Sequence, residues 1–186
     1  MSTGLNPYNP SSLYISKTMS IALPVYIEIE KGSNIKYEYD KSKATLVVDR
    51  ILPESHGYPF AYGFFPGTLA DDGDELDALI IRTKNDIQNN KVYPVHIVGA
   101  LSMEDEKGMD EKILCVMADD AERIQDITDL DDNTKDTINT FFSTYKLNSP
   151  GRWSKTFGFM NKSQAIQLYA KSCSEEFMLP IGRKHV

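Results

Sequence analysis

The segment DDGDELD at residues 71–77 places five carboxylates within seven positions. Carboxylates at this density repel one another, so the segment needs cations or protons to compensate its charge. Oxygen ligands of this kind suit hard ions such as Mg²⁺ or Mn²⁺. An EF-hand calcium loop does not fit, because the sixth position holds no glycine and no glutamate closes the loop. The segment therefore predicts a metal site, with a solvated acidic loop as the alternative.

A second acidic segment, EDEKGMDEK at residues 104–112, lies between two apolar stretches. If the strands next to the two acidic segments are neighbours, both loops open at the same end of the fold. Carboxylates that converge from separate loops form the multi-metal sites used for in-line attack on phosphorus. The second segment therefore favours a metal centre over two independent solvated loops.

Groups that could bind a phosphate accompany the acidic segments. They are Lys36, Arg50, Tyr58, Tyr62, Tyr145 and Lys146. Each also has an ordinary structural explanation, since strand lysines are usually solvated and Tyr145 shares an apolar helical stripe with Phe141. Beside metal ligands, however, such groups predict a phosphate or diphosphate held between cations and side chains.

Strands must position most of these groups. Apolar and polar residues alternate over residues 25–30 and again over 35–40, with the turn signal Gly32-Ser33-Asn34 between them. This pattern predicts two half-buried strands joined as a hairpin. Further strands are expected at 44–50, 78–81, 92–101 and 112–117.

The helical period begins only near the C-terminus. Ile138, Phe141, Phe142 and Tyr145 follow helical spacing, with Asp132 or Asn133 available as the N-cap. A second helix is expected to begin at Asn161 or Ser163 and to bury Ile166, Tyr169, Ala170 and Cys173. Strands followed by two helices indicate an α+β fold, a small β-barrel flanked by helices.

Composition limits the partners. The 186 residues include 20 basic and 27 acidic side chains, a net charge of −7, which argues against double-stranded nucleic acid. Cys115 and Cys173 have no spacing suited to zinc or to a disulfide framework. The longest apolar stretch, 92–101, is too short to span a bilayer, and residues 1–20 lack signal-peptide features. We therefore expect a cytoplasmic protein without a membrane partner.

The chain resembles the soluble family I inorganic pyrophosphatases. Residues 72–77 resemble the family signature Asp-x-Asp-(Pro or Glu)-apolar-Asp. The resemblance continues in order through IEIEKGSNIKYEYD, VDR, GYPFAYGFFPGT, MEDEKGMDEK and FFSTYK…GRW, over residues 24–153. It implies an OB-like five-stranded β-barrel with flanking strands and two C-terminal helices, and Mg²⁺-dependent hydrolysis of diphosphate.

The resemblance also implies roles for individual residues. Ligands of several Mg²⁺ ions, for which Mn²⁺ or Zn²⁺ could substitute, are Asp72, Asp77, Asp105, Asp110 and Glu28. Asp74 corresponds to the carboxylate that takes the proton from the attacking water. The groups that hold the two phosphates are Lys36, Arg50, Tyr62, Lys112, Tyr145 and Lys146. Glu38 and Tyr58 match supporting positions.

The chain departs from the family pattern at a few positions. Ala61 stands where Asn is usual, and Arg152 replaces the commoner Lys. The short chain implies a homo-oligomer, with a hexamer favoured, although Thr140 and Thr144 replace the interface histidines of many bacterial hexamers. One domain is expected at 23–177, with an N-terminal arm or disordered tail at 1–22 and a C-terminal tail at 178–186.

Two other functions fit parts of the sequence. A barrel of this kind can bind single-stranded nucleic acid through aromatic side chains, which residues 58–65 supply, but the net charge of −7 opposes it. A pyrophosphatase-like module without activity would keep the fold alone. Binding to single strands without metal would favour the first alternative, and failure to release phosphate would favour the second.

Overall fold

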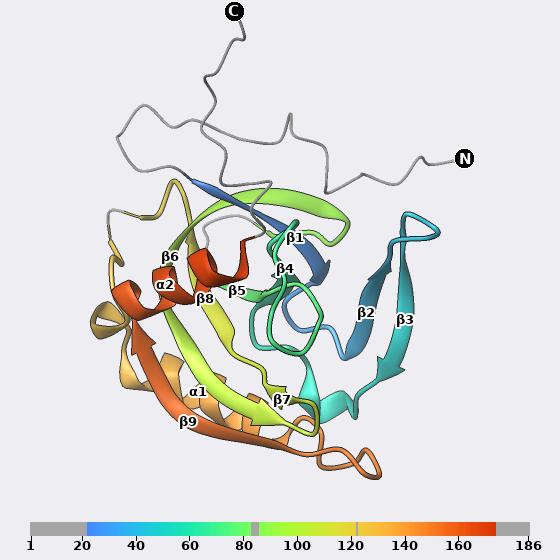
Figure 1. The fold of residues 1–186 in the computed structure, drawn as a ribbon. Helices are drawn as coiled ribbons and strands as arrows, with labels where there is room; N and C mark the ends of the chain where they lie inside the picture. The colour runs from blue at the N-terminus through green and yellow to red at the C-terminus, as the bar shows by residue number, and fades with distance from the viewer. Residues whose placement is uncertain (1–21, 83–85, 122, 174–186) are drawn as a thin grey trace, which may run out of the picture.

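A closed five-stranded barrel forms the centre of the computed structural model, which describes residues 22–82, 86–121 and 123–173 (Figure 1). Its strands, in order around the barrel, are β1 (Leu23–Ile29), β4 (Ala61–Phe64), β5 (Asp77–Arg82), β8 (Lys112–Met117) and β6 (Lys91–Asp105). The barrel closes because β6 also pairs with β1. The predicted five-stranded barrel is thereby confirmed. The predicted arm, apart from Ala22, and the predicted tail lie outside the described residues.

Two further strands and two helices flank the barrel. The strands β7 (Gly108–Met109) and β9 (Ser154–Asn161) both pair with β6. The helices are α1 (Asp132–Thr144) and α2 (Lys162–Ser172), and single 3-10 turns occupy Glu54–His56 and Ile127–Asp129. The α+β fold with two C-terminal helices is therefore as expected. None of the described helices is long and apolar enough to cross a membrane.

The strands β5 and β8 run parallel, and this pairing decides where the acidic segments lie. Asp77, the first residue of β5, is in register with Lys112, the first residue of β8. The segments that precede these strands, 71–76 and 104–111, therefore meet at one end of the barrel. The expectation that both acidic loops open at the same end is confirmed.

The predicted hairpin between residues 25–30 and 35–40 is wrong. Strand β2 (Ile35–Asp40) pairs instead with β3 (Thr45–Ile51) in a separate two-stranded sheet, at the right of Figure 1. Both edges of β1 are already occupied, by β4 on one side and β6 on the other. Because β1 is enclosed in the barrel, its alternating polar positions are buried too, as Tyr26 and Glu28 show.

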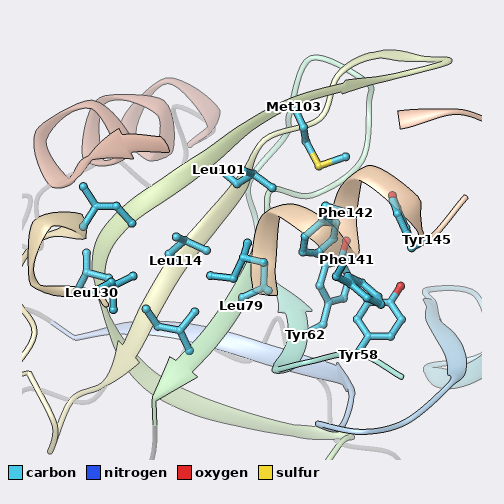
Figure 2. Close-up of a cluster of buried hydrophobic side chains, with 14 of the residues drawn as sticks. Tyr58, Tyr62, Leu79, Leu101, Met103, Leu114, Leu130, Phe141, Phe142 and Tyr145 are labelled. Carbon is cyan, nitrogen blue, oxygen red and sulfur yellow. The ribbon is translucent and has the colours of Figure 1, made fainter. Parts of the chain in front are cut away.

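Helix α1 packs its apolar stripe against the barrel. Ile138, Phe141, Phe142 and Tyr145 are all buried, as the spacing predicts (Figure 2). The cap lies one residue earlier than expected, because the carboxylate of Asp131 accepts the amide N–H of Thr134.

Helix α2 begins near the predicted position, after an N-cap at Asn161, but its buried face differs. Ile166 is 44% exposed and Ala170 is also exposed, whereas Ala165 is fully buried. The small side chain of Ala165 allows the helix to lie close to the barrel, and the larger Ile166 turns outward.

The two cysteines should differ sharply in reactivity. Burial raises the pKa of Cys115, which is fully enclosed in the core, whereas Cys173 is half-buried at the end of α2. We expect one thiol to react with a maleimide in the native protein and two in denaturant, because only an accessible thiolate reacts. The variant Cys173→Ser should lose the native labelling and Cys115→Ser should keep it; the reverse pattern would contradict this placement.

Candidate active site

A cavity of about 730 Å³ opens at the end of the barrel where the acidic segments meet. Its walls come from the β2–β3 hairpin, the segment before β5, the β6–β8 connection and the chain after α1. Thirteen of the fourteen predicted site residues line it: Glu28, Lys36, Glu38, Arg50, Tyr62, Asp72, Asp74, Asp77, Asp105, Asp110, Lys112, Tyr145 and Lys146. The fold thus brings together residues that the sequence spreads over more than half of the chain.

Tyr58 is the predicted residue that does not line the cavity. It is buried behind Tyr62, with their ring centroids 5.2 Å apart, and its ring centroid lies 4.7 Å from that of Phe141 (Figure 2). Burial raises the pKa of Tyr62 well above its usual value, and the charge of Asp77 raises it further. The hydroxyl of Tyr62 therefore stays protonated and can donate a hydrogen bond to an anion, while Tyr58 packs against the Tyr62 ring from the core side.

The buried ammonium of Lys112 joins two carboxylates at the floor of the cavity. Its Nζ lies 2.5 Å from Oδ2 of Asp77 and 2.5 Å from Oδ1 of Asp110. Burial alone would lower the pKa of Lys112, but the two carboxylates raise it well above its usual value. Burial raises the pKa of Asp110 to about 6, against the opposing effect of Lys112. The parallel β5–β8 register creates this cluster, because it sets Asp77 opposite Lys112.

Lys146 is also paired with two carboxylates of the cavity lining. Its Nζ lies 2.5 Å from Oδ2 of Asp105 and 3.2 Å from Oε2 of Glu106. Burial alone would raise the pKa of Asp105, but the hydrogen bond from Lys146 lowers it below its usual value. Glu106 also accepts the amide N–H of Trp153, which ties the chain after α1 to the acidic loop.

A β-bulge in the β2–β3 hairpin gathers two cations on one wall. Lys36 is in register with Arg50 and the next pair is Tyr37 with Val48, so Asp49 has no register partner on β2. A bulge re-aims the side chains at its position. Oδ2 of Asp49 lies 3.1 Å from Nζ of Lys36, and within the described structure Nε and Nη1 of Arg50 have no hydrogen-bond partner. Both Lys36 and Arg50 line the cavity, so this wall suits an anion.

Glu28 is buried where β1 meets the hairpin. Its Oε1 accepts the amide N–H of Tyr39 at 2.6 Å. Burial, together with the charge of Asp77, raises the pKa of Glu28 to about 8. One oxygen of this predicted metal ligand is thus engaged in holding the hairpin.

Asp72 and Asp74 lie on the turn before β5, at the mouth of the cavity. Oδ1 of Asp72 accepts the amide N–H of Asp74, and Oδ2 of Asp74 lies 3.0 Å from Nζ of Lys107. Gly73 between them has a φ of +91°, a conformation that other residues rarely adopt. The glycine therefore permits the turn that brings both carboxylates to the same side.

The donor set suits a divalent metal bound through oxygen. Within the residues described, no three carboxylate, imidazole or thiol groups already form a complete metal site. A carboxylate that accepts from Lys112 through one oxygen can still bind a metal through the other, which applies to both Asp77 and Asp110. Eleven carboxylates and seven basic side chains line the cavity. With this excess of negative charge, an anionic ligand is attracted only together with cations.

Ten lining residues are not among the fourteen predicted site residues: Tyr39, Asp40, Lys41, Ser42, Asp49, Phe64, Glu75, Glu106, Lys107 and Arg152. Neighbouring strand residues normally face opposite sides, so Asp49 and Arg50 were not expected to share a wall. The bulge is the reason they do. Lys41 and Asp40 lie where the hairpin turns, and the wrong pairing of β1 with β2 hid their position relative to the cavity.

The fold and the site together define a carboxylate-rich cavity with several basic side chains at one end of a five-stranded barrel. The sequence pattern of the inorganic pyrophosphatase family matches residues 25–176. An inorganic pyrophosphatase of Helicobacter pylori strain J99 is 46% identical over 157 residues, which cover 81% of this chain and 89% of the relative. That of Thermus thermophilus is 40% identical over 163 residues, 86% and 93% of the two chains.

Comparison with solved structures gives the same family. The inorganic pyrophosphatase of Helicobacter pylori superposes with a TM-score of 0.80 at 42% identity, over 90% of this chain and 99% of the other. The Thermus thermophilus enzyme gives a TM-score of 0.79 at 37% identity, over 90% and 98%. The chain belongs to the inorganic pyrophosphatase family.

Proposed function

We propose that the protein hydrolyses inorganic diphosphate to two phosphates in a Mg²⁺-dependent reaction. The observation that carries the proposal is the cavity, which brings the basic side chains of Lys36, Arg50, Lys112 and Lys146 together with the carboxylates of both acidic loops. Membership of the inorganic pyrophosphatase family supports the same substrate.

The proposed metal ligands are the carboxylates that the two acidic loops bring to one end of the barrel: Asp72, Asp77, Asp105, Asp110 and Glu28. All-oxygen donors suit Mg²⁺, and Mn²⁺ or Zn²⁺ could substitute. When bound, several such ions neutralise the substrate and make the attacking water more acidic.

The side chains would divide the remaining work by position. Lys36 and Arg50 on the hairpin, with Tyr62, Lys112, Tyr145 and Lys146 on the other walls, would hold the phosphate oxygens. Asp74 at the mouth would accept the proton of the water as its oxygen attacks phosphorus in line. The bond from phosphorus to the bridging oxygen then breaks, and basic side chains stabilise the charge on the leaving phosphate. Glu38 and Tyr58 would support these groups.

Phosphate release is the direct test. Purified protein stripped with EDTA should release no phosphate from diphosphate, and added Mg²⁺ should restore turnover. Failure to release phosphate at any Mg²⁺ concentration would favour the inactive interaction module instead. Binding of a single-stranded oligonucleotide in EDTA would favour the nucleic-acid-binding barrel, although the excess of carboxylates in the cavity opposes it.

We also propose a homo-oligomer, with a hexamer favoured, in the cytoplasm. Thr140 is exposed on α1 and Thr144 is half-buried one turn later, so an interface here would use hydroxyls and apolar packing rather than histidines. Light scattering at micromolar concentration should give a multiple of the 21.0 kDa subunit mass. A mass of 21.0 kDa under these conditions would contradict the proposal.

A further inference from the structure

The β2–β3 hairpin carries one wall of the cavity, yet within the described structure it forms its own sheet and pairs with no barrel strand. Lys36 and Arg50 lie on this hairpin, whereas Asp74 and Asp77 lie on the segment that leads into β5. The separation between the proposed phosphate-binding groups and the proposed metal-binding loop therefore depends on how the hairpin is seated.

The β2–β3 hairpin is held at two places, its base and its middle. At the base, the amide N–H of Gly32 donates to the carbonyl oxygen of Tyr58 at 2.7 Å. In the middle, the amide N–H of Tyr39 donates to Glu28, and the ring of Tyr39 meets that of Tyr26 edge to face at 5.1 Å. The contacts of Tyr39 anchor the hairpin to β1, whereas the bond at the base ties the β1–β2 connection to the segment before β4. None of them reaches the proposed metal-binding loop.

The tip makes a third contact, and this one crosses the mouth of the cavity. Nζ of Lys41 lies 2.5 Å from Oε1 of Glu75, whose side chain is only 14% exposed. Glu75 stands directly between Asp74 and the start of β5, so the ion pair joins the hairpin to the loop that bears the proposed general base. The side chain of Lys41 is 64% exposed, so the ion pair joins a surface ammonium to a mostly buried carboxylate.

We infer that Lys41 is a positioning residue: its ion pair with Glu75 clasps the hairpin tip to the metal-binding loop and sets the two walls at the spacing that diphosphate requires. This inference rests on the proposed function. If the clasp is lost, the hairpin is seated for only part of the time, and the apparent affinity for substrate falls by that fraction. Turnover of substrate already bound changes little, because the substrate itself then bridges the two walls.

The kinetic test compares Lys41→Met with Lys43→Met. Lys43 is equally exposed on the same turn, but its partner is Asp40 within the hairpin, and it does not line the cavity. We expect Lys41→Met to raise KM for Mg-diphosphate by about threefold to tenfold and to change kcat by less than about twofold. Lys41→Arg and Lys43→Met should keep the wild-type KM.

Variants of the partner separate a clasp from direct contact with substrate. Glu75→Gln should raise KM as much as Lys41→Met, and the exchanged pair Lys41→Glu with Glu75→Lys should regain most of the loss, since only the charge pair matters. If Glu75→Gln leaves KM unchanged, or if the exchanged pair is no better than Lys41→Met alone, the clasp is overturned.

Hydrogen exchange of the apo protein supplies a readout that needs no activity. The amide of Tyr39 should exchange about threefold to tenfold faster in Lys41→Met than in wild type or Lys43→Met, because local opening governs exchange. Equal exchange rates in all three proteins would overturn the clasp. Faster exchange in a protein that never hydrolyses diphosphate would support the clasp and overturn the proposed function.

Discussion

Replacing Asp74 with asparagine is expected to lower kcat for diphosphate by about 10²–10⁴, the usual contribution of a positioned general base. The amide has nearly the same shape as the carboxylate but cannot accept the proton of the attacking water. Asp74 is exposed on the turn before β5, so the free energy of unfolding should change little. The measurement is steady-state phosphate release at saturating Mg²⁺, together with a urea unfolding curve.

Asp71→Asn is the matched control for this loss. Asp71 lies on the same turn, is exposed, pairs with Lys171 of α2 and does not line the cavity. It should keep wild-type kcat, because it removes the same charge from the loop without touching the site. If Asp74→Asn retains most of its turnover, or if Asp71→Asn loses as much, Asp74 is not the proton acceptor.

Lys112→Met should destabilise the fold by about 3–5 kcal/mol, because removal of the buried ammonium leaves two half-buried carboxylates of like charge without compensation. The side chain of Lys112 is 2% exposed, and it is the group that separates the carboxylates of Asp77 and Asp110. Methionine fills nearly the same volume, so the effect reports the lost charge rather than a cavity. Urea unfolding in EDTA measures it without any contribution from bound metal.

Lys171→Met provides the comparison. Its ion pair with Asp71 is exposed on both sides, and exposed pairs contribute about 0–1 kcal/mol. A loss of less than about 1 kcal/mol for Lys112→Met would mean that the two carboxylates relax apart or take up protons without strain, and that Lys112 does not hold the floor of the cavity together.

The elements that the sequence predicts best are those whose buried residues form an uninterrupted or regularly spaced pattern along the chain. Strand β8 is predicted at its observed bounds, Lys112–Met117, because an unbroken apolar run lies between two polar segments. The buried stripe of α1 is also predicted, because its apolar residues recur at helical spacing. Strand β9 was missed, because its outward face carries Phe157 and its inward face begins with Ser154, which reverses the usual pattern.

Strand β4 was missed for a different reason. Its four residues, Ala61–Phe64, are all buried and show no alternation. Gly63 permits the close approach of β1, since a Cβ there would lie 1.8 Å from the carbonyl oxygen of Tyr26. A sequence shows that a glycine is present, but the neighbour that requires it is a strand more than thirty positions earlier. The error in pairing β2 has the same origin.

The convergence of the two acidic segments could be predicted because charge is a local signal and two acidic loops leave few places to converge. Thirteen predicted residues line one cavity, yet their proposed roles depend on the resemblance rather than on position. What could not be predicted is which charges neutralise one another. The pairing of Lys112 with Asp77 depends on a parallel register, and that of Lys41 with Glu75 depends on a hairpin whose partner was misassigned.

The closure of the barrel by β1 and β6 has a consequence for synthesis on the ribosome. Leu23 pairs with Val95, so the first strand of the barrel waits for the chain to grow by about seventy residues before its second neighbour exists. Contacts this distant in sequence make folding slow, since the entropy of loop closure is lost before any contact offsets it. The nascent chain therefore exposes the apolar residues of β1 and the acidic segment 71–77 together, and the repulsion among those carboxylates helps to keep it from collapsing or aggregating before β6 emerges.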